Sequence, residues 1–433
     1  MTSEQSLRKA SYHIGIFAVS KFVSVMGANI VAFGISLYIL KLTGSATSFS
    51  INILCSIVPR VLFSPLIGYM ADRYNKKVLV ISSQILTVVT VAILLLYANW
   101  QGMSIMAIYI MMVFYTIFTS CSGITLTASI GQLVDQDRIQ KVMSLNQLSM
   151  SLAAIGAPMI GGVLYGFVSI EVFLIIQIIA FSISTLLDAT MNFNLYKTEK
   201  IHTEKSEPFL KSMKSAYHYI KNRKTLKTII ILALCLNLFF SAFSVGISYV
   251  LVEVVQFKSL HVGWIESIGA VGMLLASIYL TARKNLKNPI RFSKRALFAL
   301  SSIFFIFALP LVILELTYLQ LFIYYGVTAF LMTMAEVCTN VPIGVILQKN
   351  IEESYRGRVF ALFETLAMGM MPFGILIYGF LYDYFGAPIV LIVTGVIVFT
   401  ITLYLLRPSV LKQMEQEQQY EETEKLIEDK KIA

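Results

Sequence analysis

Residues 68–77 read Gly68-Tyr-Met-Ala-Asp72-Arg73-Tyr-Asn75-Lys76-Lys77, a polar segment between two long apolar runs. Its glycine lets a neighbouring helix approach closely, and its aspartate can face the positive end of a helix dipole. The three basic residues after the aspartate can hold the segment at an anionic membrane surface. The pattern therefore predicts a short loop at the membrane surface that joins two spanning helices.

Apolar residues continue on both sides of this loop and along the whole chain. Of the 433 residues, 57% are hydrophobic and 13% are charged, whereas a soluble domain carries about 25% charged residues. The mean hydropathy is +0.76. One globular core cannot hold this much apolar surface, because the core would still need a polar shell. The composition therefore predicts a membrane protein and no nucleic-acid partner, although the net charge is +10.

Twelve segments are long and apolar enough to cross a bilayer, which takes roughly 20 residues per helix. They form two sets of six on either side of a polar stretch, 194–227. The predicted spans are 12–40, 46–70, 78–98, 103–128, 141–167, 170–191, 228–254, 260–282, 295–314, 317–346, 358–381 and 386–406. We predict an all-α membrane protein with twelve transmembrane helices in two six-helix bundles, 1–193 and 228–406, followed by a cytoplasmic tail, 407–433.

Orientation follows from Lys and Arg, because these residues are retained on the cytoplasmic side of spanning helices. With the amino terminus inside, all but four of the 34 basic residues fall in cytoplasmic segments. Lys41 and Lys258 fall outside, and Lys21 and Arg60 fall within spans. We therefore predict that both termini are cytoplasmic. The Lys-, Ile- and Tyr-rich composition, with few Arg, suggests a bacterium of low genomic GC content. We therefore predict a bacterial plasma (inner) membrane as the location.

The polar stretch 194–227 carries apolar residues every three to four positions, with Lys and Arg between them. This pattern is typical of a short helix in the headgroup layer with its apolar side towards the lipid. The apolar positions are Phe209, Met213, Ala216, Tyr217 and Ile220. A structural linker is the simpler interpretation, and a regulatory partner site is the alternative.

The two halves of the chain also echo each other, as expected of transporters built from repeated bundles. Similar residues follow one another in the same order near the fifth and eleventh spans. The first-half set is Arg138, Val142, Pro158, Gly162 and Gly166, and the second-half set is Arg356, Val359, Pro372, Gly374 and Gly379.

The loop at residues 68–77 resembles the loop signature of the major facilitator superfamily, G-x-x-x-D-R-x-G-R-R. Asn75 stands where the family has glycine, and Asn tolerates a left-handed turn better than most residues. Further resemblance, to the drug:proton antiporter branch with macrolide efflux proteins and the enterobactin exporter, is spread over the chain. It covers Gly27 to Phe33, residues 42–46, Pro59 with Pro65, Tyr217 to Asn237, residues 356–360 and the Gly156-Ala157-Pro158 stretch.

Two departures from that branch concern coupling to protons. The fourth span, 103–128, lacks the arginine that many proton-coupled members carry there. The second-half counterpart of the Asp72 loop, around Arg283, Lys284 and Lys287, has no acidic residue. These departures do not change the expected family fold. They argue against the commonest way in which members of the family couple transport to protons.

The resemblance implies a secondary transporter that exports an amphipathic small molecule, a drug or antibiotic, by proton antiport with alternating access. Export of a siderophore or other metallophore is an alternative, which the basic pair of Lys21 and Arg60 would favour. Flipping of a lipid or lipid-linked sugar is another. A non-transporting membrane receptor is the alternative of a different class. The implied partners are a small-molecule substrate, protons and the lipid bilayer, with a monomer as the default state.

The resemblance also assigns gating residues on the cytoplasmic face. The aspartate of the loop would meet basic residues near the fifth and eleventh spans and hold that face in one state. The candidates are Gly68, Asp72, Arg73, Lys76, Lys77, Arg138, Pro158, Arg356 and Arg358.

Charged residues inside the spans are the candidates for coupling. A charge at the centre of a spanning helix costs about 2.5–3.5 kcal/mol on insertion scales, so it needs a partner or a wet cavity. The first half offers Lys21 and Arg60 and no acid deep within its spans. The second half offers Glu336 as the preferred proton carrier, then Glu266, Glu364 and Glu253. Arg60 and Glu364 can also pair across the halves, Lys21 can reach the inner interface, and Glu253 can lie among outer headgroups.

Polar and aromatic residues inside the spans are candidates for lining a substrate cavity. Asn29 and Asn237 occupy loosely comparable places in the first spans of the two halves. Hydrogen bonds between helices explain such residues equally well. Tyr115, Phe239 and Phe240 could form an adaptable apolar pocket, although aromatic residues in membrane proteins more often serve in packing or interface belts.

Several kinds of site have no support in the sequence. The four cysteines lie far apart, and the four histidines have no ligand spacing, so no metal site is predicted. No G-x-x-x-x-G-K-[ST] phosphate loop is present. We predict no cofactor and no enzymatic activity.

Overall fold

The structure, a computed structural model, describes residues 3–196, 218–221, 223–282, 288–313, 315–349, 351 and 353–412. These residues fold into helices and short connections, with no strand among them. The predicted headgroup helix of the linker lies outside the described residues apart from 218–221. Most of the predicted tail, from residue 413 onward, also lies outside them.

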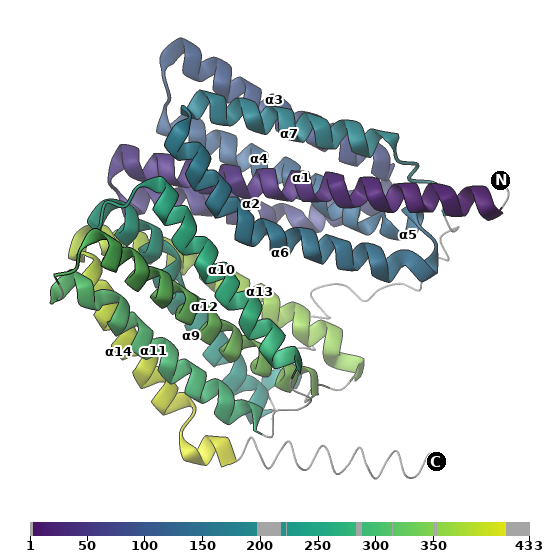
Figure 1. The fold of residues 1–433 in the computed structure, drawn as a ribbon. Helices are drawn as coiled ribbons and strands as arrows, with labels where there is room; N and C mark the ends of the chain where they lie inside the picture. The colour runs from purple at the N-terminus through teal and green to yellow at the C-terminus, as the bar shows by residue number, and fades with distance from the viewer. Residues whose placement is uncertain are drawn as a thin grey trace, which may run out of the picture. The chain divides into compact units, whose positions relative to one another are not determined.

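The helices of the first half of the chain follow one another with short connections (Figure 1). They are α1 (Ser3–Thr43), α2 (Ala46–Arg73), α3 (Lys76–Gln101), α4 (Ile105–Ala128), the short α5 (Ile130–Leu133), α6 (Gln136–Phe167) and α7 (Ile170–Thr190). The second half holds α9 (Lys224–Tyr249), the π-helix η1 (Val250–Val254), α10 (Ser259–Ala282), α11 (Pro289–Val312), α12 (Tyr318–Lys349), α13 (Glu353–Phe385) and α14 (Ala387–Leu405).

Eleven of these helices are long and apolar enough to cross a membrane, counted over the described residues. Each matches one predicted span, and the twelfth prediction, 358–381, lies within the 33-residue α13. The all-helical membrane fold predicted from hydropathy is thus confirmed. Helices reach beyond the predicted ends where they continue into polar sequence, as α1 does from Ser3. Hydropathy records only the apolar part of a helix.

Local sequence explains where several helices begin and end. Ser45 precedes α2 and accepts a hydrogen bond from the backbone N–H of Ser48 at 3.2 Å, an N-cap that satisfies one of the unpaired donors of the first turn. Gly102 follows α3 with φ 83°, a conformation that side chains rarely adopt, and its N–H bonds the carbonyl of Ala98. Capping and glycine termination keep these connections only a few residues long.

The chain divides into two compact units. Unit 1 comprises Met1–His202 together with Ser248–Ser267, and unit 2 comprises Thr203–Ile247 with Ile268–Ala433. Within unit 1, α1 packs against α2, α6 and α7, while α4 packs against α2 and α3, and α3 against α7. The apolar core between these helices includes the buried side chains of Ile35, Val91, Met111 and Phe173.

Within unit 2, α11 packs between α12 and α14, and α13 packs against α14. The core of this unit gathers buried side chains from most of its helices, such as Leu236, Leu297, Ile343 and Val398. Glycine brings α13 close to α9, because a Cβ on Gly374 would lie 2.6 Å from the carbonyl oxygen of Leu238. Close backbone approach through small residues is the usual way in which membrane helices pack.

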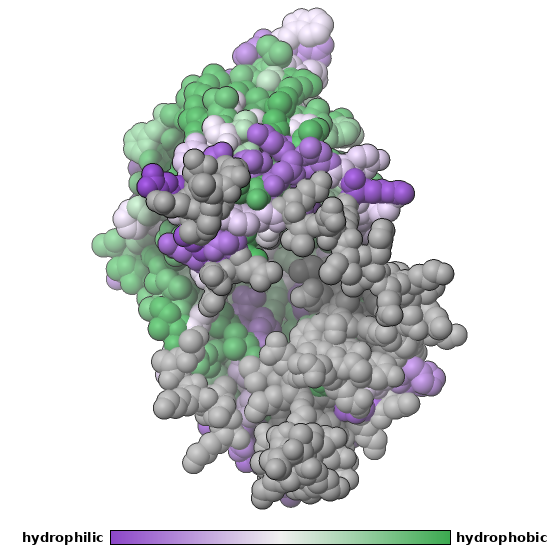
Figure 2. All heavy atoms as spheres, turned by 90° about the vertical axis from the view of Figure 1, so that its right-hand side faces the viewer, coloured by the Kyte–Doolittle hydropathy of each residue, from purple (hydrophilic) through white to green (hydrophobic). Residues whose placement is uncertain are grey.

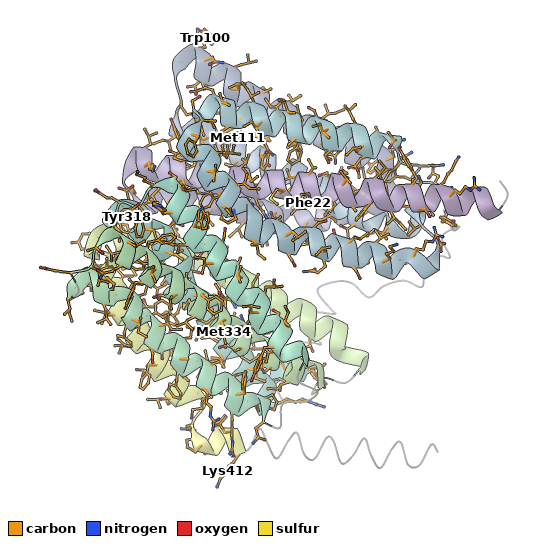
Figure 3. The ribbon with its side chains drawn as sticks, viewed as in Figure 1. Phe22, Trp100, Met111, Tyr318, Met334 and Lys412 are labelled. Atoms are coloured by element: carbon orange, nitrogen blue, oxygen red, sulfur yellow. The ribbon has the colours of Figure 1, made fainter. Side chains whose placement is uncertain are left out.

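The surface of the molecule fits a bilayer. Figure 2 shows hydrophilic residues on the end of unit 1 that carries the N-terminus and hydrophobic residues along its flank. Large apolar side chains of unit 1, such as Leu96 and Leu186, are exposed, whereas a soluble protein would expose polar ones. Trp100 and Tyr318 stand exposed at helix ends (Figure 3), as the aromatic residues of an interface belt do.

Candidate functional site

Unit 2 contains a cavity of about 350 Å³ among α9, α11, α12 and α13. Three of the predicted site residues line it: Glu336, Asn237 and Phe240. The sequence reasoning did not single out the other lining residues, which are Ser241, Phe243, Ser244, Leu300, Met332, Asn340 and Met371. The cavity lies wholly within one unit, so its lining is defined by the packing of that unit alone.

The polar wall of the cavity comes from α9. Asn237, Ser241 and Ser244 are spaced four and three residues apart, so they share one face of the helix. Ser241 Oγ donates to the carbonyl of Asn237 at 2.9 Å and lies 3.3 Å from the carbonyl of Met371 on α13. Asn237 Nδ2 donates to the carbonyl of Ala233 at 2.9 Å, which orients its side chain. This three- to four-residue polar period was a signal that the sequence offered.

The charged wall of the cavity comes from α12. Glu336 and Asn340 lie one helical turn apart and are both exposed, because they face the cavity. Glu336 is the one ionisable side chain among the described lining residues. In an apolar surrounding, a carboxylate whose negative charge no basic neighbour balances can accept a proton or pair with a cationic ligand. The cavity therefore presents one acidic group beside several amides and hydroxyls.

The apolar part of the lining consists of aromatic and thioether side chains. Phe243 is held edge-on against Phe307 with ring centroids 5.3 Å apart, and against Phe304 at 6.4 Å. Met332 and Met371 face the same space, and methionine adapts its shape to irregular ligands. Phe239, the other predicted aromatic on α9, is not among the lining residues, and both it and Phe240 pack against the core of unit 2. The cavity can therefore accommodate an apolar body with a polar or charged end.

Two other predicted proton carriers lie in unit 1 and are not part of this cavity. Glu266 accepts a hydrogen bond from Ser248 Oγ at 3.0 Å. Glu253, in the π-helix, interacts electrostatically with Lys41. Lys41 also donates to Ser259 Oγ at 2.8 Å and lies over the ring of Tyr165. The contacts of Lys41 with Glu253 and Ser259 join the segment Ser248–Ser267 to α1 within unit 1.

The basic candidates occupy different surroundings. Lys21 on α1 is only 7% exposed, and its Nζ lies 4.0 Å from the place of a Cβ on Gly123 of α4. Arg60 on α2 is exposed. The side chain of its predicted partner Glu364 lies outside the described part of the structure, so the pair stays a prediction.

The remaining cavity candidates of unit 1 are placed differently from one another. Tyr115 is buried in the core of this unit, where its hydroxyl accepts from Gln177 Nε2 at 2.8 Å and its ring packs edge-on against Phe181. The structure thus places Tyr115 in packing, the alternative that its sequence left open. Asn29 is exposed on α1. An aromatic residue in an apolar run gives no sign of which face of the helix meets a cavity.

Residues 68–77 end α2 and begin α3, with only Tyr74 and Asn75 between the two helices. Asn75 caps α3, accepting from the N–H groups of Lys77 and Val78 at 3.0 and 3.4 Å. Its φ of −64° shows that the expected left-handed turn does not form, because the amide side chain serves as an N-cap instead. No described atom lies within 4 Å of the place of a Cβ on Gly68, so the expected close helix contact is not seen there.

The basic residues of this loop and of the start of α6 bind within unit 1. Lys76 Nζ donates to the carbonyl of Ala128 at the end of α4, at 2.7 Å. Arg138 on α6 donates to Ser11 Oγ of α1 at 2.9 Å and pairs with Asp135 at 3.4 Å. Arg73 binds Tyr69. The side chains of Asp72, Arg356 and Arg358 lie outside the described part, and the gating roles stay predictions.

Pro158, another gating candidate, lies where α6 crosses the start of α10. A Cβ on Gly263 of α10 would overlap the carbonyl oxygen of Pro158, and one on Gly162 would lie 2.6 Å from the carbonyl oxygen of Ser259. The two backbones touch here because neither glycine has a side chain. This crossing adds to the contacts that hold the segment Ser248–Ser267 in unit 1.

Sequence reasoning missed one charged residue. Asp188, near the end of α7, was not among the predicted site residues, although its side chain is 0% exposed. Its position three residues before the end of a predicted span suggested an interfacial acid. Burial by α1 and α3 could be recognised only from the packing of the helices.

Comparisons with known proteins agree with this architecture. The family model described as Major Facilitator Superfamily matches residues 17–374. Macrolide efflux protein A of Streptococcus pyogenes is 22% identical over 389 residues, covering 88% of this chain and 92% of that protein. The protein of the same name from Enterococcus faecalis is 22% identical over 340 residues, covering 77% and 100%. The structure of the nucleoside transporter NupG is similar with a TM-score of 0.70 at 14% identity, covering 91% and 98%.

Proposed function

The chain belongs to the Major Facilitator Superfamily, and from this premise we propose that it exports an amphipathic drug or antibiotic in exchange for protons. It is a multi-pass membrane transporter of the secondary type and not an enzyme. The resemblance to the superfamily, noted first at residues 68–77, is confirmed by the match over residues 17–374. Substrate, coupling ion and the location in a bacterial plasma membrane are parts of the proposal.

The observation that carries the proposal is the position of Glu336. This residue of α12 is the one ionisable group among the described lining of the cavity. Asn237 and Ser244 of α9 line the same cavity. A carboxyl group in such a place can bind either a proton or a cationic substrate, and the two then compete for it. Competition of this kind is the simplest route to antiport, since release of one ligand follows from binding of the other.

The dimensions and the lining of the cavity bear on the substrate. Ligand pockets in proteins measure about 300–1,000 Å³, so the 350 Å³ here takes a small ligand or one end of a larger one. Phe240, Phe243, Met332 and Met371 suit an apolar body, and Glu336 suits a protonated amine. A cationic amphiphile, such as an antibiotic that carries an amino group, combines both features.

The alternatives are less well supported. The relatives from Streptococcus pyogenes and Enterococcus faecalis are named as macrolide efflux proteins, which favours a drug over a siderophore or a lipid. The siderophore alternative relied on Lys21 and Arg60. Neither belongs to the described lining of the cavity, and Lys21 is buried in unit 1. A non-transporting receptor would tolerate the loss of the Glu336 carboxylate.

The test uses everted membrane vesicles with an imposed inside-acid pH gradient, read by a quenched acridine dye. We expect macrolides or lipophilic cations to dequench the dye in vesicles with the wild-type protein, because each substrate molecule that enters releases protons. Glu336→Gln should abolish this response, since the glutamine is isosteric but cannot bind a proton or balance a cation.

The matched control is Glu315→Gln, which neutralises an exposed carboxylate of unit 2 outside the lining of the cavity. It should leave dequenching unchanged. Dequenching only by carboxylate siderophores would establish the alternative substrate class. Full activity of Glu336→Gln, with the protein present in the membrane, would overturn the role of Glu336, and no response to any class would overturn proton antiport of these substrates.

A further inference from the structure

Unit 1 contains a buried acidic residue that the proposed function does not use. Asp188 lies in α7 against α1 and α3, and its side chain is completely buried. Gln84 Nε2 of α3 donates to Asp188 Oδ2 at 2.6 Å. Asp188 Oδ1 is also buried and has no hydrogen-bond partner within the described residues. A buried carboxylate oxygen that lacks a partner is costly, so this atom needs an explanation.

A buried lysine accompanies this acid. Lys21 on α1 is 7% exposed and interacts electrostatically with Asp188, while the two side chains are not in direct contact as an ion pair. Of the helices packed against α7, α1 contributes this lysine, α3 contributes the uncharged Gln84, and α6 contributes no charged group recorded as interacting with the aspartate. The site therefore holds one acid and one base, both withdrawn from water.

The neighbouring hydroxyl groups fix the surroundings of the pair. Ser20, next to Lys21, lies beside the carboxylate and bonds Ser184 Oγ of α7 at 2.8 Å. This bond joins α1 to α7 one turn before Asp188. Gln84 occupies Oδ2, so Oδ1 is the oxygen that remains available to a further ligand. A proton fits this place, because it needs no room beyond the atom itself.

We infer that Asp188 is a second proton-binding carboxyl group, which loads and releases a proton inside unit 1 with Lys21 as its charge partner. In the loaded state an O–H bond exists at Oδ1 and the carboxyl group is neutral. Release of the proton restores the carboxylate, whose charge Lys21 partly balances by its electrostatic interaction. The residue lies in a different unit from Glu336, so one protein would carry two separate proton sites. The inference rests on the proposed proton coupling.

The structural alternative is that Asp188 stays ionised and merely joins α7 to α3 through Gln84. A buried ion pair without direct contact is weak support for stability, because two desolvated charges gain little at a distance. In a permanently ionised carboxylate, Oδ1 would have no hydrogen-bond donor within the described residues, and only the nearby Ser20 and Lys21 would offset its charge. The two interpretations differ in whether the proton content of Asp188 changes with pH.

The experiment records infrared difference spectra of the purified protein in lipid nanodiscs during a pH titration, without substrate. Protonated carboxyl groups have a C=O stretching band that carboxylates lack. We expect Asp188→Asn to lose one component of this band and Glu336→Gln to lose another. In Lys21→Met the Asp188 component should persist to a higher pH, because the positive charge that favours the carboxylate is gone. Ser184→Ala, which keeps both charges, should retain the component.

The outcomes separate this inference from the proposed function. An unchanged band in folded Asp188→Asn would overturn the inference, even if the vesicle assay establishes drug export. Loss of the component, without any drug response in vesicles, would support the Asp188 site while the substrate proposal fails. Should Asp188→Asn not fold, Lys21→Met and Gln84→Leu keep the carboxyl group, and an unaltered titration in both would contradict the inference.

Discussion

Asn75 shows how one side chain can serve a different purpose from the family residue that it replaces. Glycine at this place would allow a left-handed turn, whereas Asn75 adopts an ordinary φ of −64° and caps α3. Its side-chain oxygen accepts two backbone hydrogen bonds, from Lys77 and Val78. The loop is therefore stabilised by a helix cap, and this has a measurable consequence.

Replacement of the cap should lower stability without a change in charge. We expect Asn75→Ala to reduce the free energy of unfolding by about 0.5–2 kcal/mol, because two donors of the first turn lose their acceptor. Asn75→Asp should retain the stability, and Asn75→Gly should cost only a few tenths of a kcal/mol. Thermal unfolding in detergent measures the series. Equal midpoints for Ala and Asp would show that the cap contributes nothing.

Single residues also mark the limit of what the sequence could predict about the site. Glu336 stood out because a charge inside an apolar span is rare. Asp188 did not, since an acid near the end of a span reads as interfacial until the neighbouring helices are in place. Tyr115 and Phe240 are indistinguishable by composition, yet one lies in the core and the other lines the cavity. Chemistry identifies candidates, and packing decides among them.

At the scale of elements, the crossing of α6 with α10 depends on glycine in both helices. We expect Gly263→Ala to destabilise the protein by about 1–3 kcal/mol, because the new methyl group would overlap the carbonyl oxygen of Pro158 and force the helices apart. The unfolding midpoint should fall, and transport by the remaining folded protein should fall with it.

The control for this substitution lies on α6, the partner helix of this crossing. A Cβ on Gly166 of α6 would meet nothing within 4 Å among the described atoms, so Gly166→Ala should cost no stability. If Gly263→Ala were as stable as Gly166→Ala, the close approach of the two helices would not be a feature of the protein in solution.

Elements also differ in how well the sequence predicted them. The long spans could be predicted from hydropathy, because a helix that crosses lipid must be apolar over most of its length. The π-helix Val250–Val254 and the short α5 have no hydropathy signal of their own. The polar face of α9, Asn237 with Ser241 and Ser244, was readable from its period. Its pairing with α12 to form a cavity was not, since weak apolar patterns do not specify which helices become neighbours.

At the scale of the whole molecule, the distribution of charge makes a prediction about orientation. Basic residues near an anionic surface gain about 1 kcal/mol each. With the termini inside, the ends of the chain and the Arg73–Lys77 loop all lie at the cytoplasmic leaflet, while Lys41 and Lys258 lie outside. The opposite orientation would place nearly all the positive charge on the outer side. The positions of the basic residues behind the +10 net charge thus predict which side of the membrane each loop faces.

Orientation can be measured with single cysteines and a membrane-impermeant maleimide, in a protein whose four native cysteines are replaced by serine. Gln101→Cys, next to Trp100 at the end of α3, should react in right-side-out vesicles only. Lys412→Cys, the last described residue of unit 2, should react in everted vesicles only (Figure 3). The reversed pattern would mean that the charge rule fails for this protein. Labelling of both sites from the same side would contradict the odd number of crossings that the twelve-span architecture places between residues 101 and 412.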